Sequence, residues 1–232
     1  YLKGKHKFFT WENKDDLNIS RGLLLKSIEI DTNLLSAELA LGYTYFDQWR
    51  NDEAFEIFSR CLEKSQIIGD NRYIANSLKA VGEIYWRKHD IERSMQYYNE
   101  ALEIFHEINN KHGIGHTYRD IGNLTAMSGE LDNALILYSN SQDAFVELGD
   151  DIETERTLNN IGNVSIGKGD YTKAKTSLEA SLALNTLHDN KNGLLRNYSN
   201  LSRMYRHLED YENALKYNNL KYNLILSLDL SP

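Results

Sequence analysis

The hydrophobic and small residues of this chain return to the same positions every 40 residues. The positions that we call anchors are Gly42, Gly82, Gly122, Gly162 and Ser202. A large apolar residue precedes each anchor, Tyr, Thr or Ser follows three positions later, and Ala or Ser follows twelve positions later. Small residues at fixed offsets among large apolar ones are typical of two closely packed helices in each repeated unit.

Turn residues divide each unit into two helices. Within a unit, a pair such as Gly169-Asp170 follows the anchor by seven residues, and between units a second pair such as Gly149-Asp150 recurs on the same period. Glycine can end one helix and the acid that follows can cap the next. The one proline, Pro232, interrupts nothing. Each unit is therefore predicted to be helix, turn, helix and loop.

These elements predict an all-α fold, a right-handed superhelix or α-solenoid of about six helical hairpins. Each hairpin would bury its apolar face only against its neighbours, so we expect a single domain over residues 1–232. Its units are expected at 1–34, which is an atypical first hairpin, and at 35–74, 75–114, 115–154, 155–194 and 195–232.

The anchor, aromatic and alanine positions together resemble those of the tetratricopeptide repeat, although the unit has 40 residues rather than roughly 34. The longer unit, with the core Asn160-Ile161-Gly162-Asn163, is similar to the repeats of intracellular peptide-sensing regulators and of spindle-orientation scaffold proteins. Residues 1–34 resemble, over a short motif, the first such hairpin in the C-terminal regions of some bacterial nucleotide cyclases. The family resemblance implies a module that binds proteins or peptides.

Composition excludes several classes of function. No run of about 20 apolar residues is present, so a membrane span is not expected. The formal net charge of -8 argues against bulk attraction to nucleic acid. A single cysteine, Cys61, rules out an internal disulfide and favours a cytoplasmic setting, and we expect it to be a small buried packing residue.

No constellation of residues in the sequence predicts catalysis. Only His112 and His116 have the spacing of two metal ligands on one helix face, and they straddle a loop without a clear third ligand. We therefore expect no enzyme activity from this chain, no cofactor and no metal site.

The first helix of each hairpin is expected to line a concave groove. The positions predicted to face that groove carry seven bases and two acids, whereas the rest of the chain carries 19 bases and 32 acids. Six of the seven bases are arginines, which suit bidentate recognition of carboxylate or phosphate. Charge is therefore segregated by face, which favours an acidic ligand, although a solvated or internally paired face remains the alternative.

Asparagines fall on the same predicted face, and one carboxamide can pair with both the N–H and the C=O of an extended peptide. The family resemblance implies this role for Asn123, Asn159 and Asn163, with Arg119, Arg156 and Arg196 as cations. The complete set of candidate peptide-binding residues is Asn76, Lys79, Arg119, Asn123, Arg156, Asn159, Asn163, Arg196, Arg203 and Arg206. Glu83 stands where a carboxylate clamp would have asparagine, so an extended acidic segment is favoured over a terminal carboxylate.

Two apolar features leave alternatives open. Leu39, Tyr43, Phe46 and Trp86 would form either internal packing or an anchor pocket for a partner side chain. The last helix is apolar nearly all round, whereas a terminal repeat usually has a polar outer face. It would be capped by another segment, would fray, or would mediate a homodimer, which we favour.

The leading hypothesis is therefore an interaction module for an extended acidic peptide or protein segment. The alternative is the C-terminal regulatory or dimerisation region of a larger signalling enzyme, such as a bacterial adenylate or guanylate cyclase. Nucleic-acid binding through the arginines is the least supported.

Overall fold

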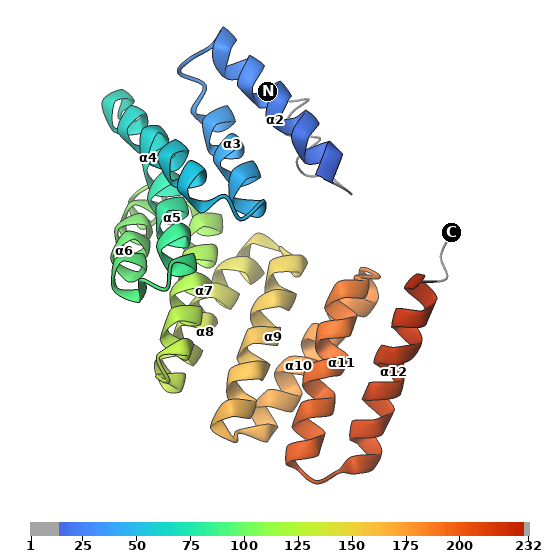
Figure 1. The fold of residues 1–232 in the computed structure, drawn as a ribbon. Helices are drawn as coiled ribbons and strands as arrows, with labels where there is room; N and C mark the ends of the chain where they lie inside the picture. Colours follow the sequence, from blue (N-terminus) through green and yellow to red (C-terminus); the bar gives the residue numbers. More distant parts are fainter. Residues whose placement is uncertain (1–13, 230–232) are drawn as a thin grey trace. The chain divides into compact units, whose positions relative to one another are not determined.

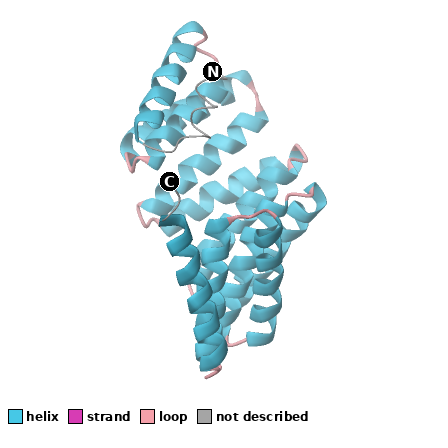
Figure 2. Ribbon diagram, turned by 90° about the vertical axis from the view of Figure 1, so that its right-hand side faces the viewer, coloured by secondary structure: helices cyan, strands magenta, loops and turns pink. Residues whose placement is uncertain are grey.

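The computed structural model describes residues 14–229, with side chains from 18 to 228. This part of the chain is built of helices joined by short loops, and no strand occurs in it (Figures 1 and 2). The helices are α2 (Lys14–Ile30), α3 (Leu35–Asp47), α4 (Asn51–Ile68), α5 (Asn71–Arg87), α6 (Ile91–Glu107), α7 (Lys111–Met127), α8 (Leu131–Leu148), α9 (Asp151–Lys168), α10 (Tyr171–Leu187), α11 (Lys191–His207) and α12 (Tyr211–Asp229).

The chain forms two compact units, Tyr1–Gly113 and Ile114–Pro232, whose boundary lies within α7. In each unit, consecutive helices pack against one another, as α5 packs on α6 and α9 on α10. In the second unit, α9 also packs on α11, which is the first helix of the following hairpin. The all-α hairpin fold predicted from the sequence is confirmed. The stretch 1–13 of the expected first hairpin lies outside the described residues.

The buried side chains form a series of clusters along each unit rather than one centre. In the first unit, a cluster around Leu24 and Leu41 is followed by another around Phe58 and Ile84. In the second unit, one cluster joins α8 to α9, and the next joins α9, α10 and α11 around Leu178. This is the packing expected of repeats that bury their apolar faces only against neighbouring helices.

The anchor glycines are contact points between the two helices of a hairpin. A Cβ atom at Gly162 would lie 2.5 Å from the Leu178 Cγ, and one at Gly82 would lie 2.7 Å from the Tyr98 ring. The fifth anchor, Ser202, has a side chain, and its hydroxyl donates to the Ala214 carbonyl at 3.0 Å. The sequence-based interpretation that the anchors let a neighbouring helix approach closely is therefore confirmed.

Acidic residues cap the helices where the turn pattern predicted them. The Asp90 and Asp170 carboxylates accept hydrogen bonds from backbone N–H groups in the first turns of α6 and α10. Between hairpins, Asp70 and Asp150 do the same for α5 and α9. Glu130 makes no such side-chain bond at the start of α8, although it occupies an equivalent position.

None of the helices in the described part of the chain is long and apolar enough to cross a membrane. Cys61 is fully buried, as expected, and its Sγ lies 3.6 Å from the Leu35 carbonyl oxygen. Burial raises the pKa of this thiol to about 11.

Candidate functional site

Two buried carboxylates on α9 pair with several of the candidate cations. Glu153 accepts from Arg119 and from Arg156, the latter at 2.7 Å. Glu155, which is 1% exposed, lies 3.4 Å from the Arg196 guanidinium. Neither acid belonged to the face counted from the sequence, so part of the positive charge predicted there is neutralised inside the second unit.

Glu155 is also the centre of a buried polar network. It accepts from Asn185 Nδ2 at 2.7 Å and from the Ser181 hydroxyl at 3.2 Å. Asn185 donates in turn to Asn197, and Asn197 donates to Ser181 at 2.8 Å. Because these contacts join α9, α10 and α11, they fix the separation of the helices that carry the remaining candidate residues.

Four of the predicted residues come together on the neighbouring faces of α9 and α11. Asn159 accepts from Asn200 Nδ2 at 3.0 Å, and Asn163 accepts from the Arg203 guanidinium. Arg196 lies two helical turns before Arg203 on α11. These contacts join residues 41 and 40 positions apart, about one unit, so the repeat itself places them side by side. Asn159 was expected to be exposed, but it is only 6% exposed because Asn200 packs over it.

Two open hollows lie along this contact between α9 and α11. The larger, of about 550 Å³, is lined by Asn159, Asn163, Leu195, Arg196, Ser199, Asn200, Arg203 and Lys221. The smaller, of about 440 Å³, is lined by Asn163, Ile166, Gly167, Lys168, Gly169, Tyr171, Arg203 and His207. Asn163 and Arg203 line both hollows, and none of the described lining residues is acidic.

The charge of the larger hollow is positive and only partly balanced. Arg196 forms an ion pair with the buried Glu155, whereas Lys221 and the nearby Arg206 form no ion pair within the described residues. Burial lowers the pKa of Arg203, and the positive charge of Arg206 lowers it further. The surface therefore offers cations and N–H donors to a ligand that supplies negative charge and acceptor oxygens.

Apart from Arg206, the other predicted residues have internal partners. In the first unit, Lys79 pairs with Glu83 on α5, and Asn76 donates to the carbonyl oxygen of Arg72 at 2.8 Å. In the second unit, Asn123 accepts from the Tyr138 hydroxyl at 2.8 Å. Asn76 and Lys79 are not among the residues that line the two hollows.

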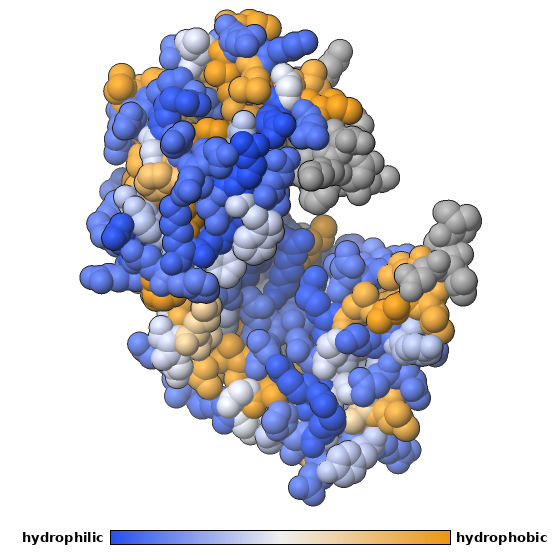
Figure 3. Space-filling view, in the orientation of Figure 1, coloured by the Kyte–Doolittle hydropathy of each residue, from blue (hydrophilic) through white to orange (hydrophobic). Residues whose placement is uncertain are grey.

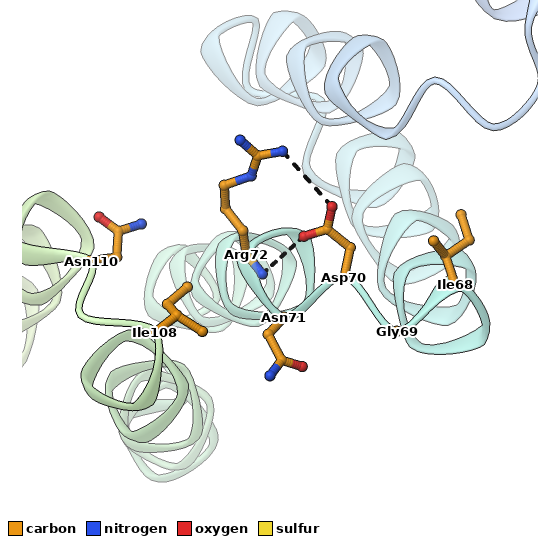
Figure 4. Close-up of a pocket in the computed structure, with 7 residues that line it drawn as sticks. All are labelled: Ile68, Gly69, Asp70, Asn71, Arg72, Ile108 and Asn110. Atoms are coloured by element: carbon orange, nitrogen blue, oxygen red, sulfur yellow. Dashed lines mark hydrogen bonds and ion pairs between the residues drawn. The ribbon is translucent and has the colours of Figure 1, made fainter.

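A further hollow, of about 750 Å³, lies on the loops of the first unit. Figure 4 shows Ile68, Arg72 and Ile108 around it, with the Arg72 guanidinium turned back toward the Asp70 carboxylate at 3.8 Å. Arg72, the one cation among the described residues that line this hollow, thus already lies beside Asp70, which is also the cap of α5. This hollow offers a ligand fewer available groups than the surface between α9 and α11.

Some of the apolar and aromatic residues near the start of the chain are internal packing, and others are exposed, where a partner could contact them. Phe46 is buried, and Leu39 and Tyr43 pack against its cluster, so these three side chains are internal packing. Trp86 is 40% exposed on α5, and Trp49 is 74% exposed in the turn between α3 and α4. Trp49 was not singled out from the sequence. The signal that could have found it is its position, because the equivalent turns of the other units have glycine or a polar residue there.

The last helix exposes a row of apolar side chains. Tyr211, Leu215 and Tyr222 are each at least 60% exposed on α12, and Ile225 and Leu226 extend the row. Figure 3 shows hydrophobic side chains gathered toward the C-terminal end of α12.

His116 does not belong to a cluster of metal-ligand type in the described part of the chain. Its Nδ1 lies 2.9 Å from the Arg119 guanidinium, and its ring packs edge-on against Phe145. His116 therefore contributes to the packing and charge network around Glu153.

Solved structures with the same arrangement of helices share little sequence with this chain. BtubC (BKLC) from P. vanneervenii has a TM-score of 0.78 at 14% identity, over 94% of this chain and 91% of its own. Aspartyl phosphate phosphatase F from Bacillus subtilis has a TM-score of 0.73 at 16% identity, over 91% of this chain and 57% of its own. A Rap protein complexed with Competence and Sporulation Factor has a TM-score of 0.69 at 12% identity, over 98% of this chain and 72% of its own.

No curated protein matches the chain significantly by sequence. The model of the tetratricopeptide repeat family does match, over residues 33–107 and 153–220. These two ranges cover more than half of the chain and include the hairpins on both sides of α7. The repeat positions, the stacked hairpins and this match together show that the chain belongs to the tetratricopeptide repeat family.

Proposed function

We propose that the second unit binds an extended, acidic peptide or protein segment on the surface between α9 and α11. Membership of the tetratricopeptide repeat family makes the chain a protein-interaction module, and the match indicates no catalytic family. The observation that carries the proposal is the pair of hollows that combine Arg196, Arg203 and Lys221 with asparagine side chains, and that no described acid lines. One structural neighbour, a Rap protein, is complexed with Competence and Sporulation Factor, which supports the binding of a partner by a protein of this fold.

Electrostatics decide the expected character of the ligand. The chain carries a net charge of -8, so an acidic segment is repelled by most of its surface and attracted only where cations remain unpaired. Lys221 and Arg206 are such cations among the described residues. A neutral or basic segment would bring no negative charge to offset the repulsion between Arg206 and Arg203.

A screen of displayed peptides with matched charge reversals tests this proposal. The variant Arg206→Glu/Lys221→Glu removes the unpaired cations, while Lys173→Glu/Lys175→Glu changes the net charge equally at two α10 residues that line neither hollow. We expect acidic peptides to be enriched by the wild type and by the α10 variant. Affinity should fall at least about tenfold, equivalent to about 1.4 kcal/mol, in the other variant. Equal enrichment by all three proteins, or none by the wild type, would contradict the proposal.

Two further sequence-based hypotheses stay proposals. The exposed apolar side chains of Tyr211, Leu215 and Tyr222 support self-association through α12. Sedimentation of the wild type and of Leu215→Ser/Tyr222→Ser would test it, because a homodimer that uses this helix should become monomeric. The hypothesis that the chain is the regulatory region of a nucleotide cyclase depends on the resemblance of residues 1–34, of which 1–13 lie outside the described residues. A catalytic domain in the same reading frame would support this hypothesis.

A further inference from the structure

The two hollows on α9 and α11 share two lining residues, which contact each other. Asn163 and Arg203 are the residues that line both, and the Arg203 guanidinium donates a hydrogen bond to Asn163 Oδ1 between them. The two residues project from facing helices and lie 40 positions apart in the sequence. The two hollows therefore adjoin at this bridge.

The bridge leaves polar groups unsatisfied. Arg203 Nε is buried and has no hydrogen-bond partner among the described residues, and the same is true of Asn159 Nδ2. Burial also disfavours the charged form of Arg203, as the lowered pKa of its guanidinium shows, and Arg206 repels it. A buried donor without a partner is costly, so an acceptor that draws the guanidinium away from Asn163 would relieve that cost.

The two hollows differ in their chemistry. The larger hollow carries Arg196 and Lys221, which attract a negative side chain. The smaller hollow is walled by the buried side chain of Ile166 and by the stacked rings of Tyr171 and His207, whose centroids are 6.2 Å apart. Those rings and the aliphatic wall suit an apolar or aromatic side chain.

We propose that the Asn163–Arg203 bridge is a gate that an acidic residue of the ligand opens, and that the ligand places an apolar or aromatic residue in the second hollow. The proposal rests on the proposed function and specifies its ligand. When the gate opens, Arg203 turns from Asn163 to the ligand carboxylate, and a single segment occupies both hollows.

Helix geometry sets the spacing of the two ligand residues. Ser199, in the larger hollow, and His207, in the smaller one, are eight positions apart on α11, which is about 12 Å along the helix axis. An extended chain covers this distance in about four residues, at roughly 3.3 Å per residue. The preferred ligand therefore has a Glu or Asp and a Phe, Tyr or Leu about three to four positions apart.

Four fluorescent peptides test the ligand chemistry. The first carries Glu and Phe four positions apart, the second has Gln in place of Glu, the third has Ser in place of Phe, and the fourth separates Glu and Phe by ten positions. We expect the first to bind at least about tenfold more tightly than each of the others. Comparable affinity for the first and any one of the other three would overturn the proposal.

Two variants test the gate, with circular dichroism as the check on folding. Arg203→Lys keeps the charge but removes the planar fork, so the first peptide should bind at least about tenfold more weakly. Asn163→Ala removes the acceptor that holds Arg203 and should increase affinity, because the closed state is lost; loss of a direct contact between Asn163 and the ligand would lower it instead. The Nε–H signal of Arg203 in nitrogen-15 NMR should move with the first peptide and not with the Gln peptide.

The outcomes separate the gate from the proposed function. If the first peptide binds equally well to Arg203→Lys, or no more tightly to Asn163→Ala than to the wild type, the gate is wrong. In that case, continued loss of acidic-peptide binding in Arg206→Glu/Lys221→Glu would still support the proposed function. If neither this variant nor the wild type binds any acidic peptide, the proposed function itself fails.

Discussion

Nine residues of the described chain have a positive φ, and they recur every 20 positions from Trp49 to Glu209. Four of them are glycines, such as Gly169, and five are not, although L residues pay roughly 1–2 kcal/mol for this left-handed conformation. The backbone conformation of each turn is therefore set by the helices on either side of it, and the residue in the turn adopts a positive φ whatever its type.

Replacing a non-glycine residue at such a turn should stabilise the protein. Glu209 has a φ of 58°, its side chain is exposed, and Glu209→Gly should raise the free energy of unfolding by up to about 1 kcal/mol. Urea denaturation measures the change. Gly169→Ala, at the equivalent turn, is the matched control and should lower the free energy by a similar amount. A loss of stability in both variants would show that the turn conformation is not what limits stability.

The burial of Cys61 predicts low reactivity of its thiol. The pKa of this thiol is raised to about 11 by burial, so at pH 8 only a small fraction is thiolate. A thiol reagent should modify the folded protein about a hundredfold more slowly than the protein in urea. Because the folded pKa is the higher one, the thiol favours folding below pH 8.5 or so and loses this contribution as pH rises toward 11. Equal rates in both states would contradict the burial.

At the scale of the element, close helix contacts depend on the anchor glycines. Gly162 and Gly167 both lie on α9, but a Cβ atom at Gly162 would be 2.5 Å from Leu178, whereas one at Gly167 would approach nothing nearer than 3.9 Å. The first position is a contact point of the hairpin formed by α9 and α10. The second has room for a side chain.

Identical substitutions at these two glycines should therefore have different effects. Gly162→Ala should lower the free energy of unfolding by about 1–3 kcal/mol, because Leu178 and the backbone of α10 must shift. Gly167→Ala should leave it unchanged or raise it slightly, since alanine favours helix over glycine. Thermal and urea unfolding of both variants provide the measurement. If both variants were destabilised equally, the effect of alanine on α9 would not come from the contact with α10.

At the scale of the whole molecule, acids outnumber bases, but one surface of the second unit has cations and no described lining acid. Acids exceed bases by eight over the chain, yet Arg203, Arg206 and Lys221 occur together on the second unit with no described acid lining the hollows beside them. Association with an acidic ligand would be directed to these cations and would depend on ionic strength.

Salt should therefore weaken binding of an acidic peptide. Raising NaCl from about 50 to 500 mM shortens the Debye length to roughly a third, and the Kd measured by fluorescence anisotropy should rise at least severalfold. The uncharged Gln analogue of the same peptide is the control, and its weaker binding should change little. A Kd independent of salt would show that attraction between opposite charges does not drive the association.

The sequence by itself determined the 40-residue period, the two helices of each unit, the contact role of the anchor glycines and the caps at Asp90 and Asp170. These features are local or repeat at a fixed interval, so residue type and position are sufficient to predict them. The tertiary structure decided which candidate cations remain available. Arg119 and Arg196 meet the buried acids Glu153 and Glu155 across 34 and 41 positions, because first helices of neighbouring hairpins lie side by side. Counting charges on a single helix face could not reveal these pairs, whereas comparison of residues about one repeat apart could have suggested them.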